Sequence, residues 1–249
     1  HYKNYMTQMP IDYTDANGVD HRMTMNGAMS VGHSMYDHYT IRYLGVDPTN
    51  GQSLFEAYYD TRKGDFLAET EDGGYNYIPS LHQWILENPD QEKYLATTIT
   101  SDPTEAALQY VGKSYLPDLS GGVGIDLECY GVTLSATCSY QVGGYGYDYT
   151  YMSLMANDPV GGHNWHQDMR NAWTENNRQT GVPRLSNGNG EFDSYANAGS
   201  TRFLTSNSFL SLNNIRLGYT FPKKMLDKIK VKRLELYVQG DNLAIASAR

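Results

Sequence analysis

Residues 121–141 alternate apolar and polar side chains with a period of two, on both sides of the dipeptide Tyr130-Gly131. In a β-strand this period places successive side chains on opposite faces. Pairing two strands across a two-residue turn sets Cys129 opposite Val132 and Leu127 opposite Leu134, so the apolar faces coincide. The sequence therefore predicts an antiparallel hairpin with one apolar and one polar face. Each strand has about nine or ten residues, the length that crosses a bilayer when tilted.

The composition is polar for a membrane protein, with a mean hydropathy of -0.57. No run approaches the roughly 20 apolar residues of a spanning helix, which excludes a helical membrane protein. A β-barrel stays compatible, because lumen-facing and loop residues dilute its apolar stripe. The 22 tyrosines suit aromatic girdles as well as loops that contact carbohydrate or peptide. The net charge of -9 argues against nucleic acid and anionic membrane surfaces as partners.

Further strands are expected on both sides of this hairpin. The segments with strand character are Met35 to Leu44, Gln52 to Tyr59, Ser208 to Phe221, and a last strand with Leu234, Leu236 and Val238 on its outward face. In the third of these the apolar residues change phase, which predicts a bulge near Asn213-Asn214. With the hairpin, this gives about six strands, fewer than the eight of the smallest closed membrane barrels.

The connections between these strands are of two very different lengths. Two long ones, residues 61–119 and 145–207, are expected to hold only short helices, at Leu81 to Glu87 and at His166 to Trp173. The others are tight turns or, at residues 222–229, a short basic segment. Outer-membrane barrels combine long extracellular loops with short periplasmic turns. The prediction is that both long connections are extracellular and that the tight turns, including Asp47-Pro48, are periplasmic.

The two cysteines lie in the same hairpin, but its register separates them. Cys138 falls opposite Val123 rather than opposite Cys129, several residue pairs away and beyond disulfide reach. Both are therefore expected to be small apolar side chains on the outward face.

Six segments, in the same order along residues 35–249, resemble segments of the SusC-like (RagA-like) TonB-dependent outer-membrane transporters. They are residues 45–51 (GVDPTNG), 110–122 (YVGKSYLPDLSGG), 139–144 (SYQVGG), 173–185 (WTENN followed by VPRL), 208–222 (SFLSLNNIRLGYTFP) and 238–243 (VQGDNL). Glu175 stands where the family commonly has proline. The first thirty residues match no family segment.

The resemblance implies an all-β chain that is part of a transmembrane antiparallel β-barrel, 22-stranded in the family, with long extracellular loops. Residues 1–249 are then the C-terminal part of the barrel domain, and the plug domain and TonB-contacting segment are absent from this chain. The implied function is import of oligosaccharides or peptides across the outer membrane of a Gram-negative bacterium. The implied partners are TonB, through the missing N-terminal part, a SusD-like surface lipoprotein and outer-membrane lipid. The alternative is a secreted, soluble β-sandwich that binds glycans.

Two groups of side chains are candidates for contact with solute. Those on the predicted lumen face are Asp126, Glu128, Gln141 and Arg216. Those in the second long connection, where aromatic rings can contact substrate or the lipoprotein lid, are Tyr145, Tyr147, Trp165 and Trp173. Packing within the loop is the simpler account of these four aromatic residues.

No catalytic or metal-binding pattern stands out. Gly112-Lys113-Ser114 lacks the first glycine of a phosphate-binding loop, because Ala107 occupies that position. His163 and His166, with Asp168 nearby, provide too few ligands at the wrong spacing for zinc. A β-rich hydrolase, the remaining alternative, would need a catalytic pair that the sequence does not contain. The sequence therefore predicts no enzyme, no cofactor and no metal.

Overall fold

The computed structural model describes residues 4–70, 73–155, 164–185 and 199–248. The chain divides into two compact units. The sheet unit comprises Tyr115–Gly146 and Thr205–Arg249, and the loop unit comprises Tyr2–Ser114 and Tyr147–Leu204. Among the described residues, no helix is long and apolar enough to cross a membrane.

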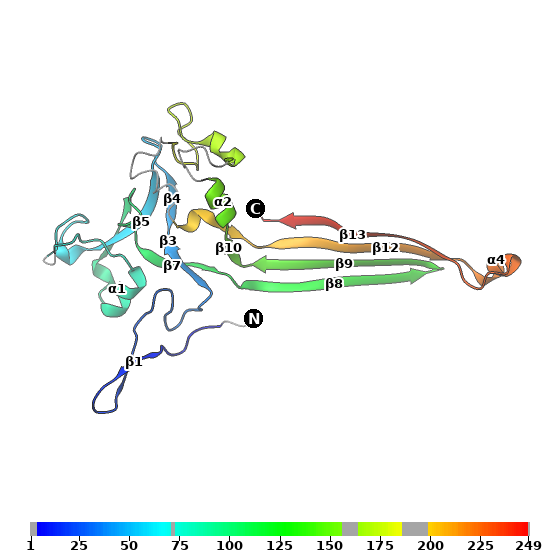
Figure 1. Ribbon diagram of the computed structural model, residues 1–249, viewed down its shortest axis with the longest axis horizontal. Helices are drawn as coiled ribbons and strands as arrows, with labels where there is room; N and C mark the ends of the chain where they lie inside the picture. The colour runs from blue at the N-terminus through cyan, green and yellow to red at the C-terminus, as the bar shows by residue number, and fades with distance from the viewer. Residues whose placement is uncertain (1–3, 71–72, 156–163, 186–198, 249) are drawn as a thin grey trace. The chain divides into compact units, whose positions relative to one another are not determined.

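The sheet unit is built on four long antiparallel strands. They are β8 (Pro117–Cys129), β9 (Val132–Gly143), β12 (Phe209–Thr220) and β13 (Glu235–Ser247), in the spatial order β13-β12-β9-β8 (Figure 1). Their 12 or 13 residues exceed the nine or ten expected for the hairpin. In the part of the chain that the structure describes, β8 and β13 are the edges of this sheet and do not close into a barrel.

The register of the hairpin confirms the sequence prediction. Cys129 pairs with Val132, Leu127 with Leu134, and Cys138 with Val123. Both cysteines are free thiols. Tyr130 and Gly131 have φ angles of 48° and 85°, as a two-residue turn between twisted strands requires. The apolar faces of the two strands therefore coincide.

The predicted bulge is also present. The register of β12 shifts between Leu212 and Asn214 against both of its neighbours, β9 and β13. The extra residue in β12 moves Leu210 and Leu212 onto the same face as Leu217. On β13 the same shift coincides with Asn242, whose φ is 53°.

A short basic segment connects β12 to β13, here called the basic connection (residues 222–233). The structure shows two short helices in it, α4 (Lys223–Leu226) and η5 (Asp227–Ile229). Leu226 is buried, and its carbonyl oxygen accepts a hydrogen bond of 3.2 Å from the Val231 amide. The basic connection and the Tyr130-Gly131 turn lie at the same end of the sheet, since the strands alternate in direction (Figure 1).

The loop unit consists of short strands and helices. Its strands are β1 (Ile11–Thr14), β2 (Asp20–Arg22), β3 (Asp37–Ile41), β4 (Tyr43–Val46), β5 (Ser53–Asp60), β6 (Leu95–Thr100) and β7 (Leu108–Ser114). They pair as β1-β2, β3-β7 and β4-β5-β6. Two further strands, β10 (Tyr145–Tyr147) and β11 (Leu204–Ser206), pair with each other where the chain passes from one unit to the other. The helices are η1 (Thr61–Lys63), α1 (Leu81–Glu87), η2 (Glu92–Tyr94), α2 (Tyr149–Leu154), η3 (Gln167–Asn171) and η4 (Thr201–Phe203).

Several expectations for this unit are corrected. The predicted strand from Met35 to Leu44 is two strands, β3 and β4, which belong to different sheets. The connection 61–119 contains β6 and β7 besides the predicted helix, whose bounds, Leu81–Glu87, are confirmed. The stretch from His166 to Trp173 forms only the 3-10 helix η3. The described residues thus hold thirteen strands rather than about six, most of them short.

The predicted placement of the Asp47-Pro48 turn and the connection 145–207 on opposite sides of the membrane is wrong. The strand directions predict a periplasmic turn and an extracellular connection, yet the Trp173 indole Nε1 donates a hydrogen bond of 3.1 Å to the Pro48 carbonyl oxygen. A Cβ atom on Gly51 would lie 2.6 Å from the Trp173 ring, so the ring packs directly on the turn. The short β4-β5 hairpin therefore lies on the same side as the long connection.

The loop unit has its own apolar core. Met155, Met169 and Phe203 are buried together, and partly buried side chains of Tyr147 and Tyr151 pack against them. Phe55 and Ala57, on β5, are also fully buried. The unit is therefore folded around its own buried side chains rather than forming an extended loop.

The Gly131 turn generates a test of the hairpin. A Cβ atom on Gly131 would lie 2.6 Å from the Thr220 carbonyl oxygen, and the φ of this residue is positive. We expect Gly131→Ala to destabilise the sheet by about 1–3 kcal/mol. Gly124→Ala is the matched control, since no atom lies within 4 Å of its Cβ position. Thermal unfolding of both variants measures the difference, and equal melting temperatures contradict this account of the turn.

Candidate functional site: the polar face of the sheet

The polar residues of the four long strands share one face of the sheet. In the observed register Asp126 lies opposite Ser135, Ser135 opposite Arg216, and Arg216 opposite Gln239. Glu128 and Gln141 occupy the same face, because each is an even number of residues from a member of this row. The structure therefore brings all four predicted lumen-face residues onto one surface.

These side chains are held by polar contacts within the sheet. The Arg216 guanidinium donates from Nη2 to Glu235 Oε1 at 3.0 Å and lies 4.2 Å from the centre of the Tyr237 ring. The Ser135 hydroxyl donates to the Asp126 carboxylate, and Gln141 Nε2 donates to the Asn207 carbonyl oxygen at 3.2 Å. Such contacts hold the charged side chains in defined positions on an otherwise open face.

A groove of about 450 Å³ runs over this surface. Its polar lining residues come from β8, β9, β12 and β13 and are Asp126, Glu128, Thr133, Ser135, Arg216 and Glu235. Leu127 and Leu134, whose side chains belong to the other face, also border it. Three carboxylates and one guanidinium therefore face the same space. Glu235 and Tyr237 were not singled out from the sequence, although the predicted outward face of Leu234, Leu236 and Val238 places them on the opposite, polar face.

The opposite face of the sheet is apolar and open. Its row of side chains includes Leu127, Leu134, Leu217 and Val238, which lie directly across from one another on the four strands. Leu127 is 58% exposed and Val238 is 78% exposed. Exposed apolar surface of this extent on long strands calls for an apolar environment.

The four aromatic candidates have different surroundings. Tyr147 packs in the core of the loop unit, and its hydroxyl accepts a hydrogen bond of 3.3 Å from the Ser200 amide. Trp173 packs on the 47–51 turn, as described above. Tyr145 is half-buried in β10, whereas Trp165 is 49% exposed. Tyr147 and Trp173 thus have packing roles, and Trp165 presents the most accessible ring.

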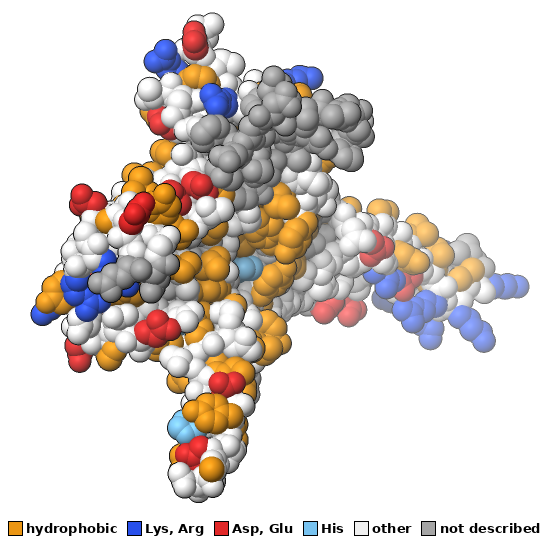
Figure 2. Space-filling view, turned by 60° about the vertical axis from the view of Figure 1, so that its left-hand side comes forward, with side chains coloured by type: hydrophobic (Ala, Val, Ile, Leu, Met, Phe, Trp, Pro, Cys, Tyr) orange, Lys and Arg blue, Asp and Glu red, His pale blue; other side chains and the backbone are white. Residues whose placement is uncertain are grey.

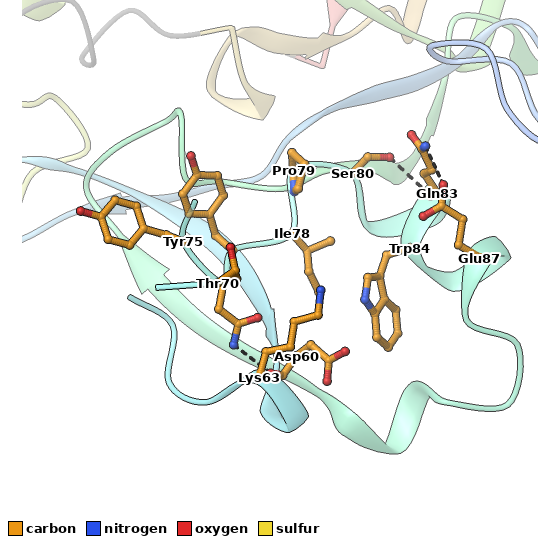
Figure 3. A pocket seen from close by; sticks show the side chains of 12 residues that line it. Asp60, Lys63, Thr70, Tyr75, Ile78, Pro79, Ser80, Gln83, Trp84 and Glu87 are labelled. Atoms are coloured by element: carbon orange, nitrogen blue, oxygen red, sulfur yellow. Dashed lines mark hydrogen bonds between the residues drawn. The ribbon is translucent and has the colours of Figure 1, made fainter. Parts of the chain in front are cut away.

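The loop unit contains a separate pocket of about 240 Å³ that the sequence did not predict. Figure 3 shows the Trp84 side chain of α1 on one side of it and Tyr75 on the other, with Lys63 between them. Residues from the end of β5, the 70–79 segment and α1 line this pocket. Their distance along the chain explains why no local pattern indicated it.

Arg62 holds the elements around this pocket together. Its Nε donates to both oxygens of Asp60 at 2.9 and 3.0 Å, and its Nη1 donates to Gln91 Oε1 at 2.6 Å. Its guanidinium also lies 5.1 Å from the centre of the Tyr94 ring. The hydrogen bond from Arg62 lowers the pKa of the Asp60 carboxyl below 3.8, although burial opposes this shift.

Metal-ligating side chains do not cluster in the described residues: no group of three or more His, Cys, Asp and Glu lies close enough to hold an ion there. His166 Nδ1 accepts a hydrogen bond of 3.2 Å from the Asp168 amide, which caps η3. His163 lies outside the described residues.

Comparison with known proteins gives one sequence match and several structural ones. The chain is 31% identical over 127 residues, 51% of its length, to TonB-dependent receptor P3 of Formosa agariphila. It matches the structure of the RagAB peptide transporter with a TM-score of 0.59 and 22% identity over 91% of this chain. The RagAB peptide importer in its closed-closed state gives a TM-score of 0.58 and 22% identity over 88%. No family model matches.

The chain is thus similar over half of its length to a TonB-dependent receptor, and its fold is similar to a section of the RagAB peptide transporter. Both similarities agree with the resemblance of its sequence segments to the SusC-like (RagA-like) TonB-dependent transporters. The chain spans 12% of the curated relative and about a fifth, 20–21%, of the matched solved chains. These matches do not support the alternative, a secreted β-sandwich that binds glycans.

Arg62 generates a testable prediction about the loop unit. We expect Arg62→Met to lower its melting temperature at pH 7, because the buried Asp60 carboxylate loses its partner. Because the pKa of the folded protein's carboxyl is lowered, its ionised form stabilises the fold at pH values above the ordinary Asp pKa. This stabilisation disappears as the pH falls through the lowered pKa. The difference between wild type and variant is therefore expected to shrink below pH 3.8.

Lys93→Met is the matched control, since Lys93 also lies over the Tyr94 ring, at 4.9 Å, without pairing to Asp60. Thermal unfolding across pH, with hydrogen exchange of residues 81–94, measures both effects. A pH-independent difference, or an equal loss in the control, contradicts the role assigned to the Arg62–Asp60 pair.

Proposed function

We propose that this chain forms a section of the barrel wall, and the extracellular loops attached to it, of a TonB-dependent importer. The observation that carries the proposal is the exposed apolar face shared by four strands of 12 or 13 residues. At about 3.3 Å per residue, twelve residues rise about 40 Å, and a tilt of about 45° brings this to about 28 Å. That is close to the hydrocarbon thickness of a bilayer, about 30 Å.

The polar face then lines the path of the solute. Asp126, Glu128, Gln141 and Arg216 are proposed to face the lumen, where water solvates charges that lipid would reject. The hydrogen bonds from Ser135 to Asp126 and from Arg216 to Glu235 support this assignment, because they keep the charges on the polar face. Backbone groups in the wall are satisfied between strands, as an apolar solvent demands.

The loop unit is proposed to be extracellular. Both of its segments join the sheet unit at the end opposite the Tyr130-Gly131 turn. Tyr145, Tyr147, Trp165 and Trp173 all lie in the second long connection, and the exposed Trp165 ring is the one best suited to contact substrate or lid. The RagAB structures are those of a peptide importer, and we infer for this chain import of peptides or oligosaccharides.

The proposed partners are a SusD-like lipoprotein lid and TonB, which engages a part of the receptor outside this chain. Purification of the intact receptor from outer membranes tests this, with mass spectrometry of the proteins and ligands that remain bound. A stoichiometric surface lipoprotein and a peptide or oligosaccharide are expected. Recovery of the receptor in the soluble fraction, or without any lipoprotein, contradicts the proposal.

The apolar face generates a quantitative prediction. We expect Leu134→Arg to destabilise the inserted receptor by about 2–4 kcal/mol if Leu134 lies near the bilayer midplane. Ser135→Arg, one residue away on the polar face, is the control and is expected to be tolerated. Urea unfolding in lipid vesicles measures both variants. Equal sensitivity at the two positions contradicts the assignment of the faces.

A further inference from the structure

The basic connection carries a charge opposite to that of the whole chain. It contains six cationic side chains and one carboxylate, Asp227, whereas the whole chain has a net charge of -9. The cations are Lys223, Lys224, Lys228, Lys230, Lys232 and Arg233. All six are exposed, and Figure 2 shows Lys and Arg side chains gathered at this end of the sheet unit.

These lysines are not neutralised within the described part of the chain. Arg233 pairs with Glu235 at 3.1 Å, but none of the five lysines makes an ion pair among the described residues. The basic connection is nevertheless folded, since α4 is anchored by the buried Leu226 and the Phe221 amide donates to the Leu234 carbonyl oxygen at 3.0 Å. The five lysine side chains therefore project from a folded segment.

The apolar face is hollowed at the ends of β12 and β13 that lead into the basic connection. A shallow depression of about 420 Å³ lies there, lined mainly by Val132, Leu217, Tyr219, Leu236 and Val238. Gly218 is also among its lining residues. Its lining residues Tyr219 and Leu236 lie three residues along the chain from the two ends of the basic connection, Pro222 and Arg233. An apolar depression followed by a cluster of ammonium groups matches a molecule with an acyl chain and a phosphate headgroup.

We propose that the basic connection and this depression bind an anionic phospholipid of the leaflet at the short-turn end of the barrel. The lysine ammonium groups contact the phosphate, and the acyl chain lies along the depression. The negative charge of the rest of the chain does not oppose this, because charges more than about 10 Å away are screened at moderate salt. The inference rests on the proposed membrane function, which fixes the sheet in a bilayer.

The experiment uses the intact receptor in neutral detergent, titrated with phosphatidylglycerol or phosphatidylcholine and followed by native mass spectrometry. We expect preferential binding of phosphatidylglycerol that weakens as salt rises. The test variant carries Lys→Gln at positions 223, 224, 228, 230 and 232. In this variant affinity for phosphatidylglycerol is expected to fall at least about tenfold, since each cation near an anionic surface contributes separately.

The control variant removes exposed cations of the loop unit instead, as Lys63→Gln, Lys93→Gln and Arg178→Gln, and is expected to bind like the wild type. Heat-dependent gel mobility confirms that every variant is folded. Equal binding of the two lipids, or unchanged binding by the lysine variant, overturns the proposal.

A second arm identifies the leaflet. Lys228→Cys, with Cys129 and Cys138 replaced by alanine, is expected to react with an impermeant thiol reagent only after the outer membrane is permeabilised. Labelling on intact cells, with lipid A bound in preference to phosphatidylglycerol, overturns the assignment to the inner leaflet. Absence of the receptor from the membrane fraction would instead refute the proposed function, so the two failures are distinguishable.

Discussion

One shared register holds the sheet unit together. Strand β9 is hydrogen-bonded on both sides, so Leu134 lies opposite Leu127 on β8 and opposite Leu217 on β12. Because side chains alternate with a period of two, a slip of one residue would move every apolar side chain onto the polar face. The separation of the apolar and polar faces therefore depends on backbone pairing, and the bulge at Leu212–Asn214 preserves it where the sequence changes phase.

The two units are stabilised in different ways. The loop unit buries Met155, Met169 and Phe203 and fixes its edges with charged hydrogen bonds such as Arg62–Asp60. The sheet unit buries little and exposes Leu127 and Val238, which is unfavourable in water and favourable in lipid. The stability of the sheet unit therefore depends on whether water or lipid surrounds its apolar face.

Sequence patterns predicted the parts of the fold that local order determines. The hairpin register, the bulge near Asn213-Asn214 and the helix at Leu81–Glu87 all follow from neighbouring residues, and the structure confirms them. The predicted polar-face residues also share one face. The sequence does not predict strands β6 and β7, because their pairing depends on distant partners. The contact between Trp173 and Pro48, 125 residues apart, contradicts the predicted placement of their segments on opposite sides. The pocket beside Trp84 combines residues from Asp60 to Glu87, which belong to separate elements and share no local pattern.

The central claim is that one face of this sheet contacts lipid and the other contacts water. A spin-label scan along β9 tests it most directly, with single cysteines from Val132 to Gln141 in the intact receptor in lipid vesicles and both native cysteines replaced by alanine. We predict that even-numbered positions are accessible to oxygen dissolved in lipid and that odd-numbered positions are accessible to a water-soluble nickel complex. Uniform accessibility along the strand, or the opposite alternation, would contradict the account.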